Sequence, residues 1–421
     1  MLEKRKPIQV AEAVEKVMRY KQSGAVEFVS IKESHGRYLG KDLTATSDVP
    51  HFNRSPYDGF AVRSIDTKEA SLQNEVVYEV VDHIGAGYVS SKKIGPMQAV
   101  RIMTGAKIPD SCDCVVMLEV ARSFEDGDQS YMSIKRSFNA GDNVSFQGED
   151  AKKGEVLVEK GTKINPGIQA ILATFGYAEV PVAKGPVIGL FATGTELLEV
   201  EEELEDGKIR NSNSTMLIAQ IERVGGDVKY YGKLPDEFDT CYEAIATAID
   251  DVDILITTGG VSVGDFDYLP AIYEKLQAEV LFNKVAMRPG SVTTVAQING
   301  KLLFGLSGNP SACYVGFELF ARPIIRYMLG CRSPHLRKET AILQQDFPKA
   351  NPFTRFVRAD VYVTNGSLMV RPSGVDKSNI VMSLARANAF MALPGGTRGY
   401  GVGDIVEVFM LEDFVGSNWP W

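Results

Sequence analysis

The sequence predicts a multidomain chain that combines α/β and all-β parts, and three observations carry this prediction. Residues 185–330 alternate apolar strand-like runs with helix-like segments, which is typical of βαβ units and a mainly parallel sheet. Residues 75–145, and the chain from Ser333 onward, instead show short alternating runs broken by Gly, Pro, Asn and Asp. A chain of 421 residues is also too long for one hydrophobic core, so two to four domains are expected.

The composition is that of an ordinary globular protein. Hydrophobic residues make up 44% of the chain, and 45 Lys and Arg against 54 Asp and Glu give a net charge of −9, so broad nucleic-acid binding is not expected. No apolar run is long enough to cross a bilayer, and no apolar segment follows the basic Met1–Lys6, so a secretion signal is not expected. The five scattered cysteines indicate reduced thiols and a cytoplasmic location.

The N-terminal part is expected to form a discontinuous domain. Apolar residues repeat at helical spacing over Val10–Met18, and a short strand is expected over Val26–Ile31. A second helix is expected from Asn165 to Phe175, since Pro favours the first turn of a helix. Because the N-terminal helix has no obvious partner nearby, we expect it to pack against this second helix, so that residues 1–47 and 146–180 form one domain.

Residues 48–145 are expected to form an inserted β domain. The loop Val49–Val62 contains two prolines, a glycine and several polar residues beside a strand, a position that often carries function. Asp58 in this loop is a candidate site residue, and the alternative is an Asx-type turn. The segment Arg101–Ala106 likewise places Thr104 just after a strand, where it could meet a ligand or cap the turn.

Residues 181–330 are expected to form the ligand-binding α/β domain. The stretch Ile254–Tyr268 reads as a buried strand, paired glycines, two carboxylates and the start of a helix. Such a turn can hold an anion with backbone N–H groups and a hard cation with its carboxylates, and the alternative is an ordinary βα turn capped by Asp265. Strand ends of a parallel sheet share one edge, which favours a site there. The polar groups that follow strands are Glu196, Asp236, Asp265 with Asp267, and Ser307–Asn309.

Two basic residues follow the next strand of this domain. Lys284 and Arg288 are the natural cations to hold phosphates or an oxyanion, and the alternative is a pair of surface charges. A P-loop and a nucleophile elbow beside a usable histidine are both missing, and Gly85-Ala86-Gly87 does not open a βαβ unit.

Residues 331–421 are expected to form a small C-terminal β-barrel or sandwich. The alternation over Phe356–Val363 indicates a strand, and Asn365-Gly366 reads as a hairpin turn. The same alternation predicts that Arg355 and Arg358 lie on opposite faces of that strand.

Six motifs occur in order along the chain: Ser55–Val62, Arg101–Gly105, Gly148–Asp150, Thr193–Leu197, Thr258–Gly264 and Gly308–Pro310. Together they resemble the MoeA family of molybdopterin molybdenumtransferases, which includes the gephyrin E domain. Each motif is weak alone, but the ordered set is specific and covers essentially the whole chain.

The resemblance implies a reaction and an assembly. Molybdenum from molybdate would enter adenylylated molybdopterin, with Mg²⁺-dependent release of AMP. The protein would be a homodimer with its site between subunits, and a C-terminal β-barrel would follow the molybdopterin-binding α/β domain. The adenylyltransferase and molybdoenzyme chaperones are candidate partners, and neither nucleic acid nor a membrane is expected.

The resemblance also assigns site residues by position. The usual Lys-Pro-Gly-Lys-Pro segment reads Arg288–Val292 here, so one positive charge is missing at Ser291. The catalytic residues would be Asp58, Thr104, Asp150, Glu196, Asp236 and Asp267. Three of them, Glu196, Asp236 and Asp267, would also be the metal ligands. Substrate would be bound by Gly259, Gly260, Ser262, Lys284, Arg288, Gly308, Asn309, Arg358 and Ser378.

Two other functions stay open. A non-catalytic scaffold, by analogy with gephyrin's anchoring role, is disfavoured because such a scaffold would need an extra domain and a long linker. An adenylyltransferase or pyrophosphatase built on the same α/β domain is disfavoured by the flanking motifs around Asp58, Thr104 and Asp150.

Overall fold

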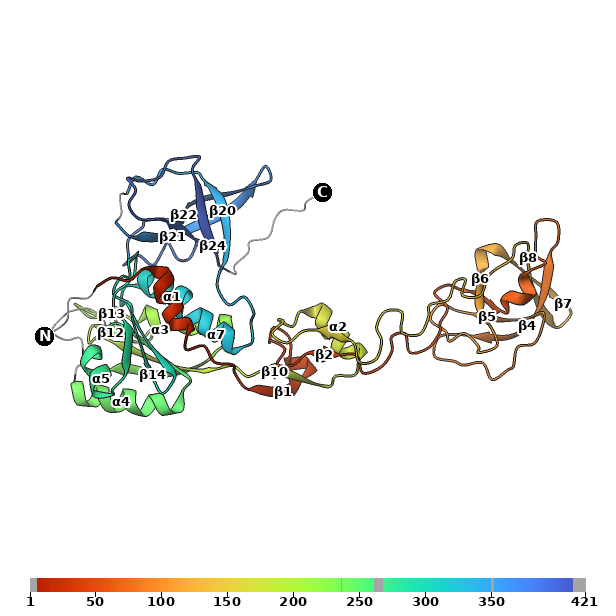
Figure 1. The fold of residues 1–421 in the computed structure, drawn as a ribbon, viewed down its shortest axis with the longest axis horizontal. Helices are drawn as coiled ribbons and strands as arrows, with labels where there is room; N and C mark the ends of the chain where they lie inside the picture. Colours follow the sequence, from red (N-terminus) through yellow and green to blue (C-terminus); the bar gives the residue numbers. More distant parts are fainter. Residues whose placement is uncertain (1–5, 236, 261–267, 350–351, 412–421) are drawn as a thin grey trace. The chain divides into compact units, whose positions relative to one another are not determined.

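The structure, a computed structural model, contains two compact units (Figure 1). We call them the main unit, which holds the parallel sheet and the C-terminal barrel, and the β unit, which holds a separate six-stranded sheet. The main unit comprises residues 1–41, 160–165 and 179–421, and the β unit comprises residues 42–159 and 166–178. The residues that the structure describes are 6–235, 237–260, 268–349 and 352–411.

A six-stranded sheet with the order β14-β11-β15-β19-β18-β16 forms the centre of the main unit. The first four strands are parallel to one another, while β18 and β16 pair antiparallel. The mainly parallel α/β sheet predicted from the sequence is therefore confirmed. The strands are β11 (Val187–Thr193), β14 (Asp227–Leu234), β15 (Ile254–Thr258), β16 (Glu279–Phe282), β18 (Thr294–Ile298) and β19 (Lys301–Leu306).

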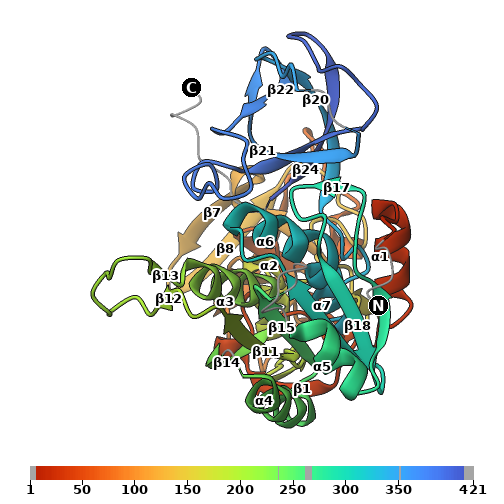
Figure 2. The same cartoon turned by 90° about the vertical axis from the view of Figure 1, so that its left-hand side faces the viewer.

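Helices cover both faces of this sheet (Figure 2). Along β15, Ile254 and Ile256 enter the core beneath α3 with Leu217, while Leu255 enters the opposite core with Ile245 of α4. A strand that is buried on both faces reads as a continuous apolar run, which is the pattern of Ile254–Thr258. The helices are α3 (Ser212–Val224), α4 (Phe238–Asp251), α5 (Leu269–Lys275), α6 (Pro310–Gly316) and α7 (Arg322–Met328), with a π-helical segment at Phe317–Ala321.

The N-terminal helix α1 (Val10–Met18) packs on the main unit. Its buried residues Ala13 and Val17 share a core with Phe320, and the helix contacts β16 and α7. The expectation that it packs against the second helix is wrong, because α2 (Pro166–Thr174) belongs to the β unit. The apolar face of α1 finds its partner in the helical layer of the main unit, and the other domain boundaries stay a prediction.

The C-terminal part forms a closed five-stranded barrel, which confirms the predicted barrel. Its strands close in the order β21-β22-β20-β24-β23 and back to β21, and β17 (Met287–Arg288) adds to β21. Asn365 and Gly366 both have positive φ angles, as a tight hairpin turn requires. The strands are β20 (Arg337–Leu343), β21 (Thr354–Thr364), β22 (Ser367–Pro372), β23 (Ala389–Leu393) and β24 (Ile405–Met410).

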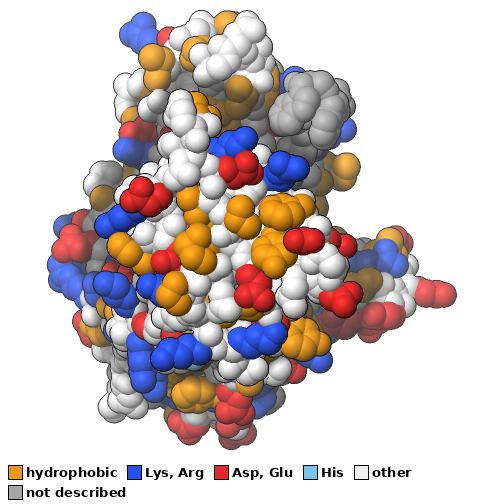
Figure 3. Space-filling view, turned by 90° about the vertical axis from the view of Figure 1, so that its right-hand side faces the viewer, with side chains coloured by type: hydrophobic (Ala, Val, Ile, Leu, Met, Phe, Trp, Pro, Cys, Tyr) orange, Lys and Arg blue, Asp and Glu red, His pale blue; other side chains and the backbone are white. Residues whose placement is uncertain are grey.

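The β unit contains a six-stranded sheet with the order β6-β3-β5-β4-β8-β7. Along β3, Phe60 and Val62 enter one core and Ala61 enters the core on the other face. Hydrophobic side chains also lie among charged ones on the surface seen in Figure 3. The strands are β3 (Gly59–Val62), β4 (Val76–Ile84), β5 (Gln98–Ile102), β6 (Cys114–Met117), β7 (Ala121–Asp126) and β8 (Gln129–Ile134).

Three two-stranded ribbons complete the described fold. The ribbons pair β1 (Val26–Ser30) with β10 (Glu179–Ala183), β2 (Leu43–Thr44) with β9 (Val156–Val158), and β12 (Leu197–Leu198) with β13 (Ile209–Arg210).

Across the described ranges, no helix combines the length and the apolar character needed to span a bilayer.

The start of β3 gives a test of packing in the β unit. A Cβ atom at Gly59 would lie 2.1 Å from the backbone oxygen of Val116, so Gly59→Ala must push β3 away from β6. We expect it to lower the free energy of unfolding of the β unit by about 1–3 kcal/mol, measured by urea denaturation. Gly85→Ala is the control, because its nearest contact is Met103 Sδ at 3.6 Å. Equal midpoints for the two variants would contradict the close approach at Gly59.

Candidate functional site

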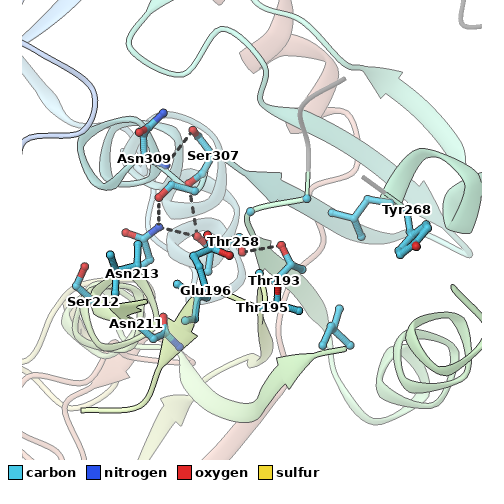
Figure 4. A pocket seen from close by; sticks show the side chains of 18 of the residues that line it. Thr193, Thr195, Glu196, Asn211, Ser212, Asn213, Thr258, Tyr268, Ser307 and Asn309 are labelled. Carbon is cyan, nitrogen blue, oxygen red and sulfur yellow. Dashed lines mark hydrogen bonds between the residues drawn. The ribbon is translucent and has the colours of Figure 1, made fainter. Parts of the chain in front are cut away.

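A cavity of about 840 Å³ lies at the carboxyl edge of the parallel sheet (Figure 4). Its wall is built from the turns that follow β11, β15 and β19 and from the start of α3. The structure places five of the predicted site residues around this one cavity: Glu196, Gly259, Gly260, Gly308 and Asn309.

Three predicted residues of the same edge lie outside the described residues: Asp236, Ser262 and Asp267, together with the alternative Asp265. Two of them were predicted metal ligands beside Glu196. Within the described part of the chain, no group of three or more His, Cys, Asp or Glu side chains could hold a metal ion. The predicted set of metal ligands therefore stays a prediction.

The turn after β15 is fixed to the strands on both sides. Thr193 Oγ1 donates a hydrogen bond to the Thr258 carbonyl at 3.2 Å, and the Gly259 N–H donates to the Leu306 carbonyl at 2.9 Å. Gly259 has a φ of +90°, and a Cβ atom there would lie 2.5 Å from Thr193 Oγ1. Glycine is thus required at this position by both the backbone conformation and the space.

The start of α3 contributes a part of the site that the sequence reasoning missed. The sequence pattern of this segment predicts a helix over Thr215–Val224, but the helix begins at Ser212, after the N-cap residue Asn211. Asn211 Oδ1 accepts a hydrogen bond from the Ser214 N–H at 3.2 Å. Asn, Ser and Asp are the preferred N-cap residues, so Asn211 is the sequence feature from which this helix start is predictable. Asn211, Ser212 and Asn213 all line the cavity, and a helix N-terminus favours an anion there.

Asp58 and Thr104 lie together in the β unit. Asp58 Oδ1 accepts hydrogen bonds from the Thr104 backbone N–H at 2.7 Å and from Thr104 Oγ1 at 2.9 Å. These two bonds, with a smaller effect of the Arg101 charge, hold the pKa of the Asp58 carboxyl below its usual range. The exposed loop therefore presents an ionised carboxylate. Asp150, also in the β unit and exposed, donates its backbone N–H to the Val49 carbonyl at 3.0 Å.

The predicted basic residues of the main unit differ in their surroundings. Lys284 is half-buried, and its carbonyl accepts a hydrogen bond from the Ile8 N–H at 3.1 Å. Arg288 is exposed on β17, directly beside Arg355 of β21. Ser378 accepts a hydrogen bond through its carbonyl from the Ser311 N–H at the start of α6.

Arg358 is buried in the barrel, with 1% of its surface exposed. Its guanidinium donates to Asp376 Oδ1 at 3.0 Å and to Ser383 Oγ at 3.3 Å. Burial lowers the pKa of Arg358, and the Asp376 charge opposes this shift. Arg355 also forms an ion pair with Asp376. Both arginines therefore contact the same carboxylate, although the alternation of the strand predicts them on opposite faces.

The fold and this cavity define a multidomain α/β protein with a pocket suited to a small anionic ligand. Three family models match successive parts of the chain. The MoeA N-terminal region (domain I and II) matches residues 8–176, the probable molybdopterin binding domain matches residues 189–327, and the MoeA C-terminal region (domain IV) matches residues 340–411.

Several known proteins are similar over nearly their whole length. The molybdopterin molybdenumtransferase of Bacillus subtilis is 60% identical over 421 residues, covering 100% of this chain and 98% of the relative. That of Staphylococcus aureus (strain COL) is 50% identical over 98% of this chain and 97% of the relative. The crystal structure of the molybdopterin biosynthesis moeA protein from Pyrococcus horikoshii OT3 has 30% identity and a TM-score of 0.81, over 96% of this chain and 100% of that one.

The chain therefore belongs to the MoeA family of molybdopterin molybdenumtransferases. This membership places it among the enzymes of molybdenum cofactor biosynthesis. The resemblance inferred from the six sequence motifs is confirmed.

The Asp58–Thr104 pair gives a test of the electrostatics of the β-unit loop. Thr104→Val removes the hydroxyl donor and keeps the backbone donor, so we expect the pKa of Asp58 to rise towards its ordinary value. The bonds stabilise the ionised form, so their contribution to folding is present above the ordinary carboxyl pKa and is lost as the pH falls through the lowered one. Carbon-detected NMR titration of the carboxyl measures the shift.

Thr104→Ser is the matched control for this titration, because it keeps the hydroxyl group. Its Asp58 pKa should stay at the wild-type value. Identical titration curves for Thr104→Val and Thr104→Ser would show that the hydroxyl does not stabilise the carboxylate.

Proposed function

We propose that this protein inserts molybdenum from molybdate into adenylylated molybdopterin, with Mg²⁺-dependent release of AMP. The observation that carries the proposal is the cavity at the sheet edge, which lies in the part of the chain that matches the molybdopterin-binding family. Its volume of about 840 Å³ is in the range of small-molecule sites.

The chemistry of the cavity wall supports a phosphate-containing ligand. The N-terminus of α3 offers backbone N–H groups to an anion, and the Gly259–Gly260 turn allows a ligand to approach the backbone closely. Lys284 and Arg288 would add positive charge, and Arg288 stands where the family usually has lysine. We propose Arg358 and Ser378 as the barrel residues nearest the molybdate path, with Arg358 held by Asp376.

The carboxylate Glu196 at the cavity fits a hard divalent cation. We propose that it holds Mg²⁺ together with Asp236 and Asp267, which lie outside the described residues. When bound, Mg²⁺ would neutralise charge on the pyrophosphate link. We further propose that Asp58, Thr104 and Asp150 contribute to the reaction, with Asp58 present as a carboxylate.

The assembly and surroundings are also proposals. We propose a cytoplasmic homodimer that receives its substrate from the adenylyltransferase and passes its product to molybdoenzyme chaperones. These proposals follow from what the resemblance to the MoeA family implies.

The proposed reaction is tested by following both products at once. Purified protein is mixed with adenylylated molybdopterin, Mg²⁺ and molybdate, and AMP release and molybdenum cofactor formation are measured together. We expect both products from the wild type. Glu196→Gln and Asp58→Asn should each slow the reaction by about 100-fold, because each removes a charged group. Glu203→Gln, in the exposed segment between β12 and β13, is the control and should match the wild type.

Two other outcomes of this assay would indicate one of the two alternative functions. AMP release without molybdenum insertion would indicate a pyrophosphatase-like enzyme. Substrate binding with neither product would indicate a binding or scaffold protein.

A further inference from the structure

We propose that Asn213 is a positioning residue that holds the two glycine-containing turns of the cavity at a fixed separation. The proposal rests on the proposed function, because the turns matter only if the cavity is the reaction site. Asn213 Nδ2 donates one hydrogen bond to Thr258 Oγ1 and another to the Gly308 carbonyl, both at 2.9 Å. Figure 4 shows both bonds leaving the same amide nitrogen. One side chain of α3 thus joins the turn after β15 to the turn after β19.

The orientation of this amide is set by its neighbours. The Gly308 carbonyl can only accept a hydrogen bond, so the nitrogen of the Asn213 amide must face it. In the opposite orientation, two oxygen atoms would face each other across the same distance. Asn213 is therefore needed as a donor, and an aspartate of the same shape would repel the Gly308 carbonyl.

The other end of the same side chain has no partner among the described residues. Asn213 is only 8% exposed, and its buried Oδ1 accepts no hydrogen bond there. A buried polar atom without a partner reduces stability, so an optimised core would not retain it for stability alone. What the amide contributes here is the pair of hydrogen bonds that its nitrogen donates to the two turns. Asn213 lines the cavity, but both hydrogen bonds of Nδ2 go to the turns and Oδ1 is buried, so we infer that its amide acts on a ligand through the turns.

Asn213 is itself held in place from the helix side. It is the second residue of α3, whose start is fixed by the Asn211 cap, and Asn211 Nδ2 donates to Tyr230 OH on β14 at 2.9 Å. Thr258 is in turn tied to the end of β11 through the Thr193 hydroxyl. The amide is thus the link between the helix start and the ends of three parallel strands. A relative shift of the turns by about 1 Å would misplace a bound substrate and slow the reaction by about 100-fold.

The main test replaces the donor without changing the shape of the side chain. For Asn213→Asp, we expect kcat for AMP release to fall by about 100-fold, with a smaller change in the Kd for AMP measured by calorimetry. The thermal midpoint is recorded in parallel. Glu222→Gln, on the exposed face of the same helix, is the matched control and should behave as wild type. Wild-type activity per folded molecule in Asn213→Asp would overturn the proposal.

A second variant keeps the proposal testable if Asn213→Asp does not fold. Thr258→Val removes one acceptor of the Asn213 amide with little change of shape, and we expect kcat to fall by about 10-fold. Adding Asn213→Ala to Thr258→Val should cost less than the product of the two single effects, because the residues act together. Strictly multiplicative effects would overturn the proposed coupling.

The experiment distinguishes an error in the proposed function from an error in this inference about Asn213. Turnover by the wild type tests the function alone, and the ratio of variant to wild type tests Asn213. If the wild type binds AMP but does not turn over, the same variants are compared by their Kd for AMP. An unchanged Kd in Asn213→Asp and Thr258→Val would then overturn the positioning role.

Discussion

The cavity of the main unit depends on the parallel pairing of β11, β15 and β19. Thr258 at the end of β15 is paired with Ala192 on one side and with Leu306 on the other, so the three strands end at the same level. Both faces of β15 are buried, and a slip by one residue would turn Leu255 and Ile256 into the wrong cores. Packing of the sheet therefore fixes where the ligand-facing turns begin.

The features that local sequence patterns control were predictable. The apolar run of β15, the glycines after it and the alternation of the barrel strands are all properties of neighbouring residues. The packing of α1 was not predictable. The apolar face of a helix indicates that it packs against another element, but it does not identify that element. The first turn of α3 was missed for a related reason. Its residues Asn211–Ser214 are polar, so the apolar period begins only after the helix has already started.

Side-chain length explains why the barrel arginines differ from the simple alternation. Arg355 and Arg358 lie three residues apart on β21, yet both reach Asp376, which comes from the loop after β22. A strand pattern describes where Cβ atoms point, and a long arginine can bring its charge elsewhere. Asp376 was not predictable as the ion-pair partner of these arginines, because the partner of a buried charge depends on how a distant loop folds. A buried charge pair of this kind is costly to break, because one uncompensated charge would remain.

The site divides its tasks between backbone and side chains. The turns around Gly259 and Gly308 shape the cavity with backbone atoms, and hydrogen bonds from Thr193 and Asn213 fix their positions. The charged residues assigned by resemblance lie elsewhere: Glu196 lines the cavity, Arg288 lies on β17, which pairs with β21 of the barrel, and Lys284 precedes β17. The hydrogen bonds that hold the turns come from uncharged side chains, so replacing a charged side chain leaves these bonds in place.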